Sequence, residues 1–347
     1  MDVLNNTDIK IMTPGPTQVA DNVYLARSLR TTNPDLDPAF YDFYRDTCHL
    51  FGKLIHTKNA CFILGGEGIL GLEAACASLT EPGDRVLVID NGIFGKGFAD
   101  FVSMYQGDPV TWSLDYHNPL APEVLRDYLE KDHAFKYATL VHSDTPSGLL
   151  NPVEALCPIL KEYGITLVAV SEDAFAAMHQ RKEPIRSFYA NLLTFETYYE
   201  DQWFPYTMPV SDIMGLRQAL ENVASDPEHL KRHAVIAAAT RKALTDAGLT
   251  LYLESGFASS VTVFYVPEGM KAQDILDTMV KEHHIMIAGC FDVLAGKVIR
   301  IGHMGNNANE ADMTVTLAAL DKTLQSLGFT RKADMAEGFT SYMNAHK

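Results

Sequence analysis

The sequence of 347 residues has little of what marks secreted, membrane-spanning or nucleic-acid-binding proteins. Its five cysteines are an odd number without a Cys-x-x-Cys pair, which argues against a disulfide framework and a structural zinc site. No apolar run approaches the ~20 residues of a membrane span, and the first residues, MDVLNNTDIK, lack the basic-then-apolar pattern of a signal peptide. Lys and Arg number 28 against 44 Asp and Glu, and the net charge of -16 disfavours nucleic acid and anionic membranes as partners. These absences predict a soluble cytoplasmic protein.

What the sequence does have, from about residue 60, is an alternation of apolar strand-like runs and helical runs. The expected strands are residues 61–64, 85–90, 110–114 and 137–142, and the expected helices are residues 68–79, 96–105, 122–131 and 152–163. Strand and helix in turn indicate an α/β fold, a mostly parallel sheet sandwiched by helices.

A smaller α+β domain is expected in the last third of the chain. The expected strands there are residues 260–266, 285–289 and 297–302, and the expected helices are residues 271–283 and about 308–327. A chain of this length exceeds what one hydrophobic core usually serves. We therefore divide it into a large domain, residues 1–225, and a small C-terminal domain, residues 226–347.

A glycine-rich segment, CFILGGEGILGLEAACASL at residues 61–79, places the start of a helix directly after a strand. The free N–H groups at such a helix N-terminus bind phosphate without needing a cation. Two other interpretations stay open on this segment alone. Gly66-x-Gly68-x-x-Gly71 fits a dinucleotide-binding fingerprint with Asp90 as the ribose-binding acid, which would indicate an NAD-dependent oxidoreductase. A plain glycine-rich turn is the other alternative.

Two further loops follow strands of the same expected sheet. Phe94 follows the second strand, and an aromatic ring there suits stacking on a planar ligand. Thr145 and Ser147 follow the fourth strand and offer hydroxyl groups. Taken singly, each loop is more simply explained as core or as a capped turn. Because open α/β sheets bind ligands at the carboxyl ends of their strands, the three loops together predict one site for a flat ring and a phosphate.

Arg300 interrupts the apolar residues of the strand expected at 297–302. An arginine seldom lies inside a fold unless an anion pairs with it, and its planar guanidinium group suits a substrate carboxylate. A structural ion pair is the alternative. His303 and the pair His283 and His284 lack ligand spacing to acids or cysteines, so no metal site is predicted.

Six segments, taken in order along nearly the whole chain, resemble the class V aminotransferases, which are fold-type-I enzymes that depend on pyridoxal phosphate. The segments are TPGPT (13–17), GGEGILGLEAA (65–75), NGIFGKGF (91–98), HSDTPSGLLNP (142–152), WFPYTMPVSD (203–212) and GKVIRIGHMG (296–305). The subgroup that they resemble contains the alanine- or serine-glyoxylate and the pyridoxamine-pyruvate aminotransferases. The resemblance favours this family over a nicotinamide-dependent dehydrogenase.

The resemblance implies pyridoxal 5'-phosphate as the cofactor and assigns residues to hold it. By that likeness, the backbone of Gly66, Glu67 and Gly68 holds the cofactor phosphate. Phe94 stacks on the pyridine ring, and Thr145 hydrogen-bonds on the side of the ring hydroxyl.

The resemblance also implies the substrates and the assembly. Arg300 would bind the carboxylate of the small amino acid or 2-keto acid, and Gly15 would line the substrate pocket. The family's aromatic-x-x-Thr element, which reaches the phosphate of the neighbouring subunit, maps onto Phe204 and Thr207. We therefore expect a homodimer with shared active sites, to which residues 1–35 contribute.

The same resemblance predicts that an internal segment is missing after Gly164. In the family, a strand there ends in an aspartate that pairs with the pyridine nitrogen, and a helix and a strand with Gly-Ser-x-Lys follow. That lysine forms the Schiff base with the cofactor. Here EYGIT is joined directly to LVAVSEDAFAAM, which resembles the strand and helix after the lysine, so about 30 or more residues are absent. Lys161 and Lys182 match no such motif and are more simply solvated.

The missing segment has chemical and mechanical consequences. The reaction loses its covalent anchor, its general base and the acid partner of the ring nitrogen, so activity is expected to fall by orders of magnitude. The large-domain sheet is expected to be short of about two strands. Either residues 165–171 occupy the missing parallel position or the sheet carries a gap, and low stability follows.

We therefore expect a class V aminotransferase by descent that moves an amino group between alanine or serine and glyoxylate or pyruvate, with inactive or impaired chemistry. A non-catalytic pseudoenzyme that binds pyridoxal phosphate or another ligand is the alternative, and the NAD-dependent oxidoreductase is less favoured. The pyridoxamine-pyruvate enzymes carry a second arginine nine residues before the position of Arg300, which is Phe291 here. That departure favours a glyoxylate or pyruvate aminotransferase.

Overall fold

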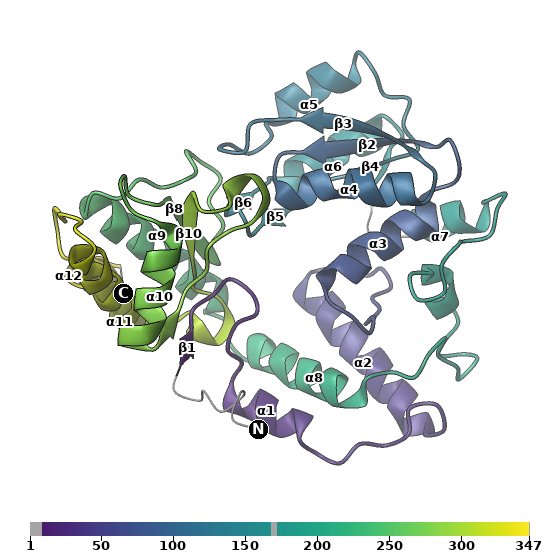
Figure 1. Ribbon diagram of the computed structural model, residues 1–347. Helices are drawn as coiled ribbons and strands as arrows, with labels where there is room; N and C mark the ends of the chain where they lie inside the picture. Colours follow the sequence, from purple (N-terminus) through teal and green to yellow (C-terminus); the bar gives the residue numbers. More distant parts are fainter. Residues whose placement is uncertain (1–8, 168–171, 347) are drawn as a thin grey trace.

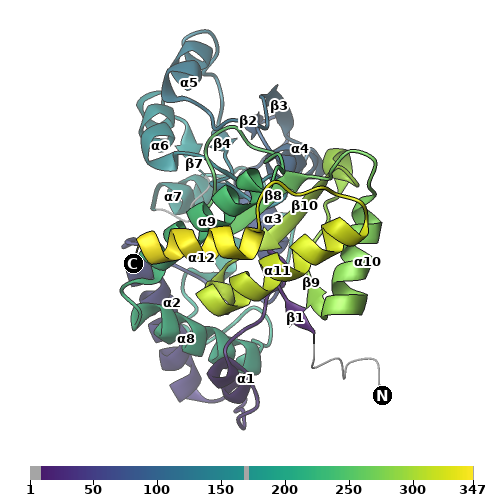
Figure 2. The same ribbon diagram turned by 90° about the vertical axis from the view of Figure 1, so that its left-hand side faces the viewer.

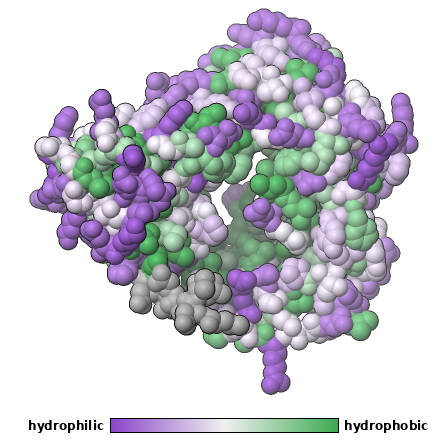
Figure 3. Space-filling model, viewed as in Figure 1, coloured by the Kyte–Doolittle hydropathy of each residue, from purple (hydrophilic) through white to green (hydrophobic). Residues whose placement is uncertain are grey.

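The computed structural model describes residues 9–167 and 172–346. Three groups of elements are arranged around a centre (Figure 1), and a hollow lies between them in the space-filling view (Figure 3). These are a parallel sheet with its helices, a C-terminal group around two antiparallel strands, and a helical group that includes the first helices of the chain. The space-filling view shows the hollow directly, with hydrophobic residues along part of its wall (Figure 3). Among the described residues, no helix combines the length and hydropathy needed to cross a membrane.

The parallel sheet has four strands among the described residues, in the order β3-β2-β4-β7. They are β2 (Arg85–Asp90), β3 (Asp108–Ser113), β4 (Tyr137–Thr139) and β7 (Thr166–Leu167). Each connection between them contains one helix, α4 (Ile93–Met104), α5 (Pro122–Leu129) or α6 (Val153–Glu162). All three pairings are parallel, as the alternation of strands and helices predicts.

The two faces of the sheet are covered by different helices because successive strand residues point to opposite sides. On one face, Val86 and Val88 pack with residues of α4 and of α3 (Gly68–Leu79). On the other face, Leu87 and Ile89 pack with residues of α5 and α6. Strands that are buried on both faces read as continuous apolar runs, and RVLVID is such a run.

The helical group contains α1 (Asp21–Arg27), α2 (Pro38–Leu54) and α8 (Val210–Ala224). Asp37 caps α2 by accepting a 3.0 Å hydrogen bond from the N–H of Ala39, and Pro38 occupies the first helical position. The core of this group is aromatic and includes Tyr44, which is 0% exposed.

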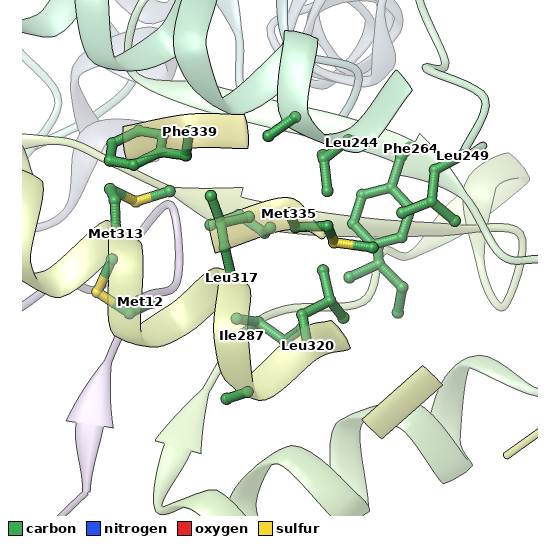
Figure 4. Close-up of a cluster of buried hydrophobic side chains, with 14 of the residues drawn as sticks. Met12, Leu244, Leu249, Phe264, Ile287, Met313, Leu317, Leu320, Met335 and Phe339 are labelled. Carbon is green, nitrogen blue, oxygen red and sulfur yellow. The ribbon is translucent and has the colours of Figure 1, made fainter. Parts of the chain in front are cut away.

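The C-terminal group consists of α9 (His229–Asp246), β8 (Val261–Tyr265), α10 (Ala272–His283), β9 (Ile285–Met286), β10 (Val298–Gly302), α11 (Glu310–Ser326) and α12 (Met335–Ala345). β10 pairs antiparallel with β8, and β9 pairs parallel with β1 (Lys10–Ile11). Figure 2 shows α11 and α12 packed beside β8 and β10. Their core is closely filled, and Met12 from the N-terminal segment is part of it (Figure 4). The expected domain boundary at 225/226 stays a prediction.

The junction after Gly164 begins with a regular helix end. Gly164 has φ +72°, and its N–H donates to Lys161 O at 3.0 Å. The N–H of Ile165 donates to Leu160 O at 3.0 Å, which completes a Schellman motif after α6. Thr166 and Leu167 then pair parallel with Tyr137 and Ala138 of β4. These two residues occupy the parallel position considered for residues 165–171, and Val168–Ser171 lie outside the described residues.

The predicted strand at 61–64 is wrong. Among the described residues, Cys61–Leu64 pairs with no strand, although Ile63 exchanges hydrogen bonds with the hydroxyl of Tyr44 at 2.8 and 3.0 Å. A strand requires a neighbour for its N–H and C=O groups, and this segment faces a cavity of about 530 Å³ across from Thr139 and Leu140. The remaining irregular or short elements are β5 (Ser143–Asp144), β6 (Leu149–Leu150), α7 (Glu172–His179), η2 (Leu192–Phe195), η3 (Asp292–Leu294) and η4 (Gly305–Asn307).

Candidate functional site

Three loops that the sequence singles out line one pocket of about 410 Å³. Glu67 and Gly68 contribute from the start of α3, Phe94 from the start of α4, and His142 and Ser143 from the segment after β4. The rest of the described wall is Ile69, Leu72, Phe98, Leu140 and Val141. The pocket thus combines a helix N-terminus, an aromatic ring and polar groups.

The start of α3 is open to an external acceptor. Glu67 is the N-cap residue, with extended backbone, and its side chain makes no capping hydrogen bond. The first N–H groups of a helix lack intrahelical partners and carry partial positive charge. An anion is therefore favoured at Gly68, where the helix begins at the pocket.

Asp144 locks two of the loops together, a role that the sequence analysis did not identify. Its carboxylate accepts hydrogen bonds from the N–H of Phe94 at 2.9 Å and from the Ser147 hydroxyl at 2.6 Å. A Cβ at Gly92 would lie 2.6 Å from Asp144 Cγ, so glycine is required for this approach. The segment Ser-Asp-Thr-Pro-Ser-Gly, typical of a side-chain-stabilised turn, was the available signal.

The carboxylate of Asp90 is hydrogen-bonded to other residues of the protein. The side chain is 5% exposed and accepts hydrogen bonds from the hydroxyl groups of Ser113, at 2.8 Å, and Tyr116. These contacts give Asp90 a structural role, which argues against its part in the dinucleotide interpretation. The neighbouring Asn91 and Asn151 exchange amide hydrogen bonds of 2.7 and 3.0 Å, which further fix this end of the sheet.

Arg300 lies in β10 without a carboxylate partner among the described residues. Its Nε donates to Gly289 O at 2.7 Å, and its guanidinium carbon lies 5.8 Å from the centre of the Phe291 ring. Burial lowers the pKa of Arg300 because desolvation disfavours the cation. The structural ion pair considered as an alternative is thus not found in the described part of the chain, and the guanidinium retains donors for an anion.

The loop that contains Gly15 lies against the strand of Arg300. The N–H of Gly302 donates to Met12 O at 2.7 Å, and a Cβ at Gly302 would lie 2.3 Å from Thr13 O. Gly15 itself is exposed, with φ +147°. Phe291 brings this side of the hollow close to the 410 Å³ pocket, because its ring centre lies 6.4 Å from that of Phe94 in the pocket wall.

Thr145, Phe204 and Thr207 do not line the 410 Å³ pocket. Thr145 is half-buried in the turn after Asp144. Phe204 is 4% exposed and stacks on Tyr41 with ring centres 4.8 Å apart, so its side chain belongs to the aromatic core. Thr207 is exposed and lines a groove of about 820 Å³ together with Gly65 and Gly66.

The described residues offer neither a metal site nor a lysine in the pocket. They contain no group of three His, Cys, Asp or Glu side chains that could hold a metal ion. No lysine belongs to the described wall of the 410 Å³ pocket. Lys96, in the first turn of α4, lies 3.8 Å from the carboxylate of Asp292 and is half exposed.

No family model matches the chain, but individual proteins do. It is 28% identical to an uncharacterised aminotransferase of Methanocaldococcus jannaschii, over 94% of this chain and 95% of that protein. It is also 28% identical to the pyridoxamine–pyruvate transaminase of Mesorhizobium japonicum, over 94% of each chain. A serine–glyoxylate aminotransferase of Methylorubrum extorquens is 25% identical over 90% of each chain.

The comparison with solved structures also finds aminotransferases. The chain superposes on pyridoxamine–pyruvate aminotransferase from Mesorhizobium loti with a TM-score of 0.92, at 25% identity and over 98% of each chain. Alanine–glyoxylate aminotransferase from Nostoc sp. gives a TM-score of 0.86 at 24% identity, over 91% of this chain and 95% of that one. The sequence alignments to the first two relatives extend over 370 and 371 positions, more than the 347 residues of this chain. At least 23 positions of the first relative therefore have no counterpart here.

Proposed function

The relatives and structural neighbours of this chain are class V aminotransferases of fold type I, which depend on pyridoxal phosphate, and from this premise we propose an amino-transfer site with impaired chemistry. The amino group would move between a small amino acid, alanine or serine, and a 2-keto acid, glyoxylate or pyruvate. The observation that carries the proposal is the single pocket formed by the N-terminus of α3, Phe94 and the loop after β4.

The residues of the pocket fit pyridoxal phosphate, which is the expected cofactor. The phosphate would accept hydrogen bonds from the backbone N–H groups of Glu67 and Gly68, where α3 has no side-chain cap. The N–H of Gly66, which the resemblance also assigns to the phosphate, already donates to Leu64 O at 2.9 Å. Phe94 would cover one face of the ring. Thr145, which the resemblance assigns to the side of the ring hydroxyl, lies in the turn after Asp144 and outside the described wall of this pocket. When bound, the cofactor supplies an electron sink for the carbanion formed at the substrate's α-carbon.

Arg300 would bind and orient the substrate carboxylate. Its donors have no carboxylate partner among the described residues, and burial makes an isolated guanidinium cation costly. A carboxylate that enters the site removes that cost and fixes the α-carbon relative to the pocket. Phe291, which faces the guanidinium group, would exclude water from one side of the contact.

The proposed impairment concerns proton transfer and covalent anchoring. No lysine belongs to the described wall of the pocket. The chain has 347 residues, whereas its alignments to two relatives extend over 370 and 371 positions. Between β7 and α7 the chain has only residues 168–171, which leaves no room in the sequence for a further strand and helix. The described pocket wall without a lysine, the longer alignments and the short connection between β7 and α7 all support a missing segment after Gly164. The proposal is thus a retained binding site with lost or slow turnover.

The proposal includes a homodimer and, as a second candidate function, a protein that binds its ligand without turnover. α1 and α8 lie together and expose apolar side chains such as Leu25 and Leu216, a surface that suits a homodimer. Thr207 is exposed and lines the groove that contains Gly66, and in such a dimer it would hydrogen-bond the cofactor phosphate of the neighbouring subunit, as the resemblance implies. If turnover is absent, the second candidate is a pseudoenzyme that binds pyridoxal phosphate or another ligand without reaction.

Borohydride reduction in the presence of pyridoxal phosphate separates these outcomes. A covalent adduct on one lysine, found by peptide mass spectrometry, together with conversion of alanine and glyoxylate, would indicate catalysis and would contradict the impairment. We expect no site-specific adduct but heat protection that pyridoxal phosphate confers and pyridoxal does not. Ligand at about 100 times its dissociation constant stabilises the folded state by about 2.7 kcal/mol. Absence of both adduct and protection would overturn the proposed cofactor site.

A further inference from the structure

The segment after Ala288 folds around the guanidinium group of Arg300. Ala288 and Arg300 exchange backbone hydrogen bonds of 3.0 and 2.7 Å across an antiparallel bridge. Gly289 O then accepts from Nε of Arg300 at 2.7 Å, which is the one hydrogen bond of this side chain among the described residues. Because Nε is engaged, the two Nη atoms suit a single carboxylate held by two parallel hydrogen bonds.

Phe291 lies between Arg300 and the pocket proposed for the cofactor. Its ring centre is 5.8 Å from the guanidinium carbon of Arg300 and 6.4 Å from the ring centre of Phe94, in the wall of the 410 Å³ pocket. A ligand that reaches from the guanidinium group to that pocket therefore passes the Phe291 ring, whose side chain is 46% exposed. An amino acid held by its carboxylate and its amino group would have its side chain next to this ring.

Two contacts hold the loop of Phe291 in place. The thiol of Cys290 donates to Pro146 O at 3.6 Å, which ties the loop to the turn after β5. On the other side, Lys96 of α4 lies 3.8 Å from the carboxylate of Asp292. The ring of Phe291 is thus fixed at both neighbouring residues and presents an apolar face, which gains from contact with apolar groups and not with charged ones.

The charges beside Phe291 disfavour a second carboxylate on the ligand. Burial raises the pKa of the Cys290 thiol, Arg300 opposes that rise, and Asp144 and Asp292 add to it. Both carboxylates are therefore close enough to act on a charge at this position. Lys96 is already paired with Asp292, and the pair has no net charge. A second carboxylate would meet an apolar ring and two like charges.

We propose that Phe291 determines the specificity of the site and restricts it to amino acids and 2-keto acids with one carboxylate and an apolar side chain. Arg300 binds the carboxylate, the ring of Phe291 contacts the side chain, and dicarboxylic acids such as aspartate are excluded. This inference rests on the proposed function and adds to it the class of side chain that the site accepts.

The test is fluorescence titration of the full chain with reduced N-phosphopyridoxyl conjugates of L-alanine, L-norvaline and L-aspartate, which need no turnover. The two additional methylene groups of norvaline become partly buried, so its conjugate is expected to bind about 3- to 10-fold tighter than that of alanine. The aspartate conjugate is expected to bind at least about 10-fold more weakly than that of alanine. Equal affinities would overturn the specificity alone, whereas failure of all three to bind would overturn the proposed function and this inference with it.

Substitution of Phe291 separates specificity from a structural role. Phe291→Ala is expected to reduce the norvaline-to-alanine preference to less than about 2-fold, whatever its effect on the affinity for both conjugates. Phe291→Leu, which keeps an apolar face, should retain most of the preference. Phe51→Ala removes a ring of similar exposure, 42%, from α2 and is the matched control. A preference that survives in Phe291→Ala would overturn the proposal.

Lys96→Gln tests whether this lysine leaves Asp292 to bind a second carboxylate. Because the pair is half exposed, the substitution is expected to change the aspartate-to-alanine ratio of affinities by less than about 2-fold. Aspartate binding that equals alanine binding in the parent chain and falls about 10-fold in Lys96→Gln would assign the side-chain site to Lys96. That result would overturn the role of Phe291.

Discussion

The C-terminal group and the parallel sheet of this chain differ in how completely their strands are partnered. β8 and β10 pair over five residues, and the helices above them close a core in which Phe264, Leu317 and Phe339 are 0% exposed. Among the residues that the structure describes, β4 and β7 pair over two residues, and the segment Cys61–Leu64 across the cavity has no strand neighbour. Residues of similar hydrophobicity are therefore closely packed in one region and face open space in the other. Packing, more than composition, is expected to decide where stability resides.

The largest expected effect is the loss of a ring from the closely packed core. Phe339→Ala removes a fully buried side chain among Met313, Leu317 and other core residues (Figure 4) and is expected to cost about 3–5 kcal/mol. Phe62→Ala is expected to cost much less, because part of the Phe62 side chain faces the cavity and meets no neighbour there among the described residues. Urea unfolding of both variants measures the difference. Equal losses would remove the contrast between the two regions.

Acid should destabilise the C-terminal group through His303. The ring is 0% exposed, it pairs with the Thr262 hydroxyl at 2.8 Å, and burial together with the charge of Arg241 lowers its pKa to about 3. The unfolded state takes up a proton near pH 6.5, whereas the folded state takes it up only near pH 3. Stability from this group is therefore full above about pH 6.5 and falls as the pH drops toward 3, by about 3 kcal/mol at pH 4.

His303→Gln isolates that contribution, since many carboxyl groups also titrate in acid. The variant is expected to lose less stability than the parent chain between pH 6.5 and pH 4, as followed by urea unfolding at each pH. His56→Gln, at an exposed position, serves as the matched control and should keep the slope of the parent chain. A slope that is identical in all three proteins would contradict the buried neutral state of His303.

The sequence predicted the elements whose signals are local, and it failed where a distant partner decides. α3 spans Gly68–Leu79 as expected, because its glycine-rich start and its apolar residues act within one helix. Cys61–Leu64 has the composition of a strand but lacks a neighbour among the described residues. Phe204 matches a sequence motif, yet its ring lies in the aromatic core, which depends on Tyr41 and therefore on tertiary packing. Asp144 was missed because the partner that makes it link two loops, the N–H of Phe94, comes from α4.

Substitution of Arg300 tests whether a carboxylate binds in the hollow between the C-terminal group and the parallel sheet. Arg300→Gln is expected to weaken binding of reduced N-phosphopyridoxyl-L-alanine about 10- to 100-fold, because charged hydrogen bonds contribute about 1.5–3 kcal/mol. Fluorescence titration measures this without any turnover. Stability should change little or rise, since Arg300 has no ion pair in the described part of the chain. Arg126→Gln, at an exposed pair with Glu162, is the control, and an equal loss of affinity there would refute a carboxylate site at Arg300.

The smallest expected effect compares the same substitution, glycine to alanine, at a loose and a tight position. In Gly71→Ala the new methyl group of α3 meets no atom within 4 Å and reduces the entropy of the unfolded chain, which stabilises by about 0.4–1 kcal/mol. In Gly95→Ala the methyl group of α4 would lie 2.8 Å from Ile89 O of β2, so the helix must move from the sheet and stability falls. A gain in the free energy of unfolding for Gly71→Ala and a loss for Gly95→Ala, both measured with urea, would show that the open space lies beside α3. A loss of stability in Gly71→Ala would mean that this face of α3 is already covered and that the cavity is filled in solution.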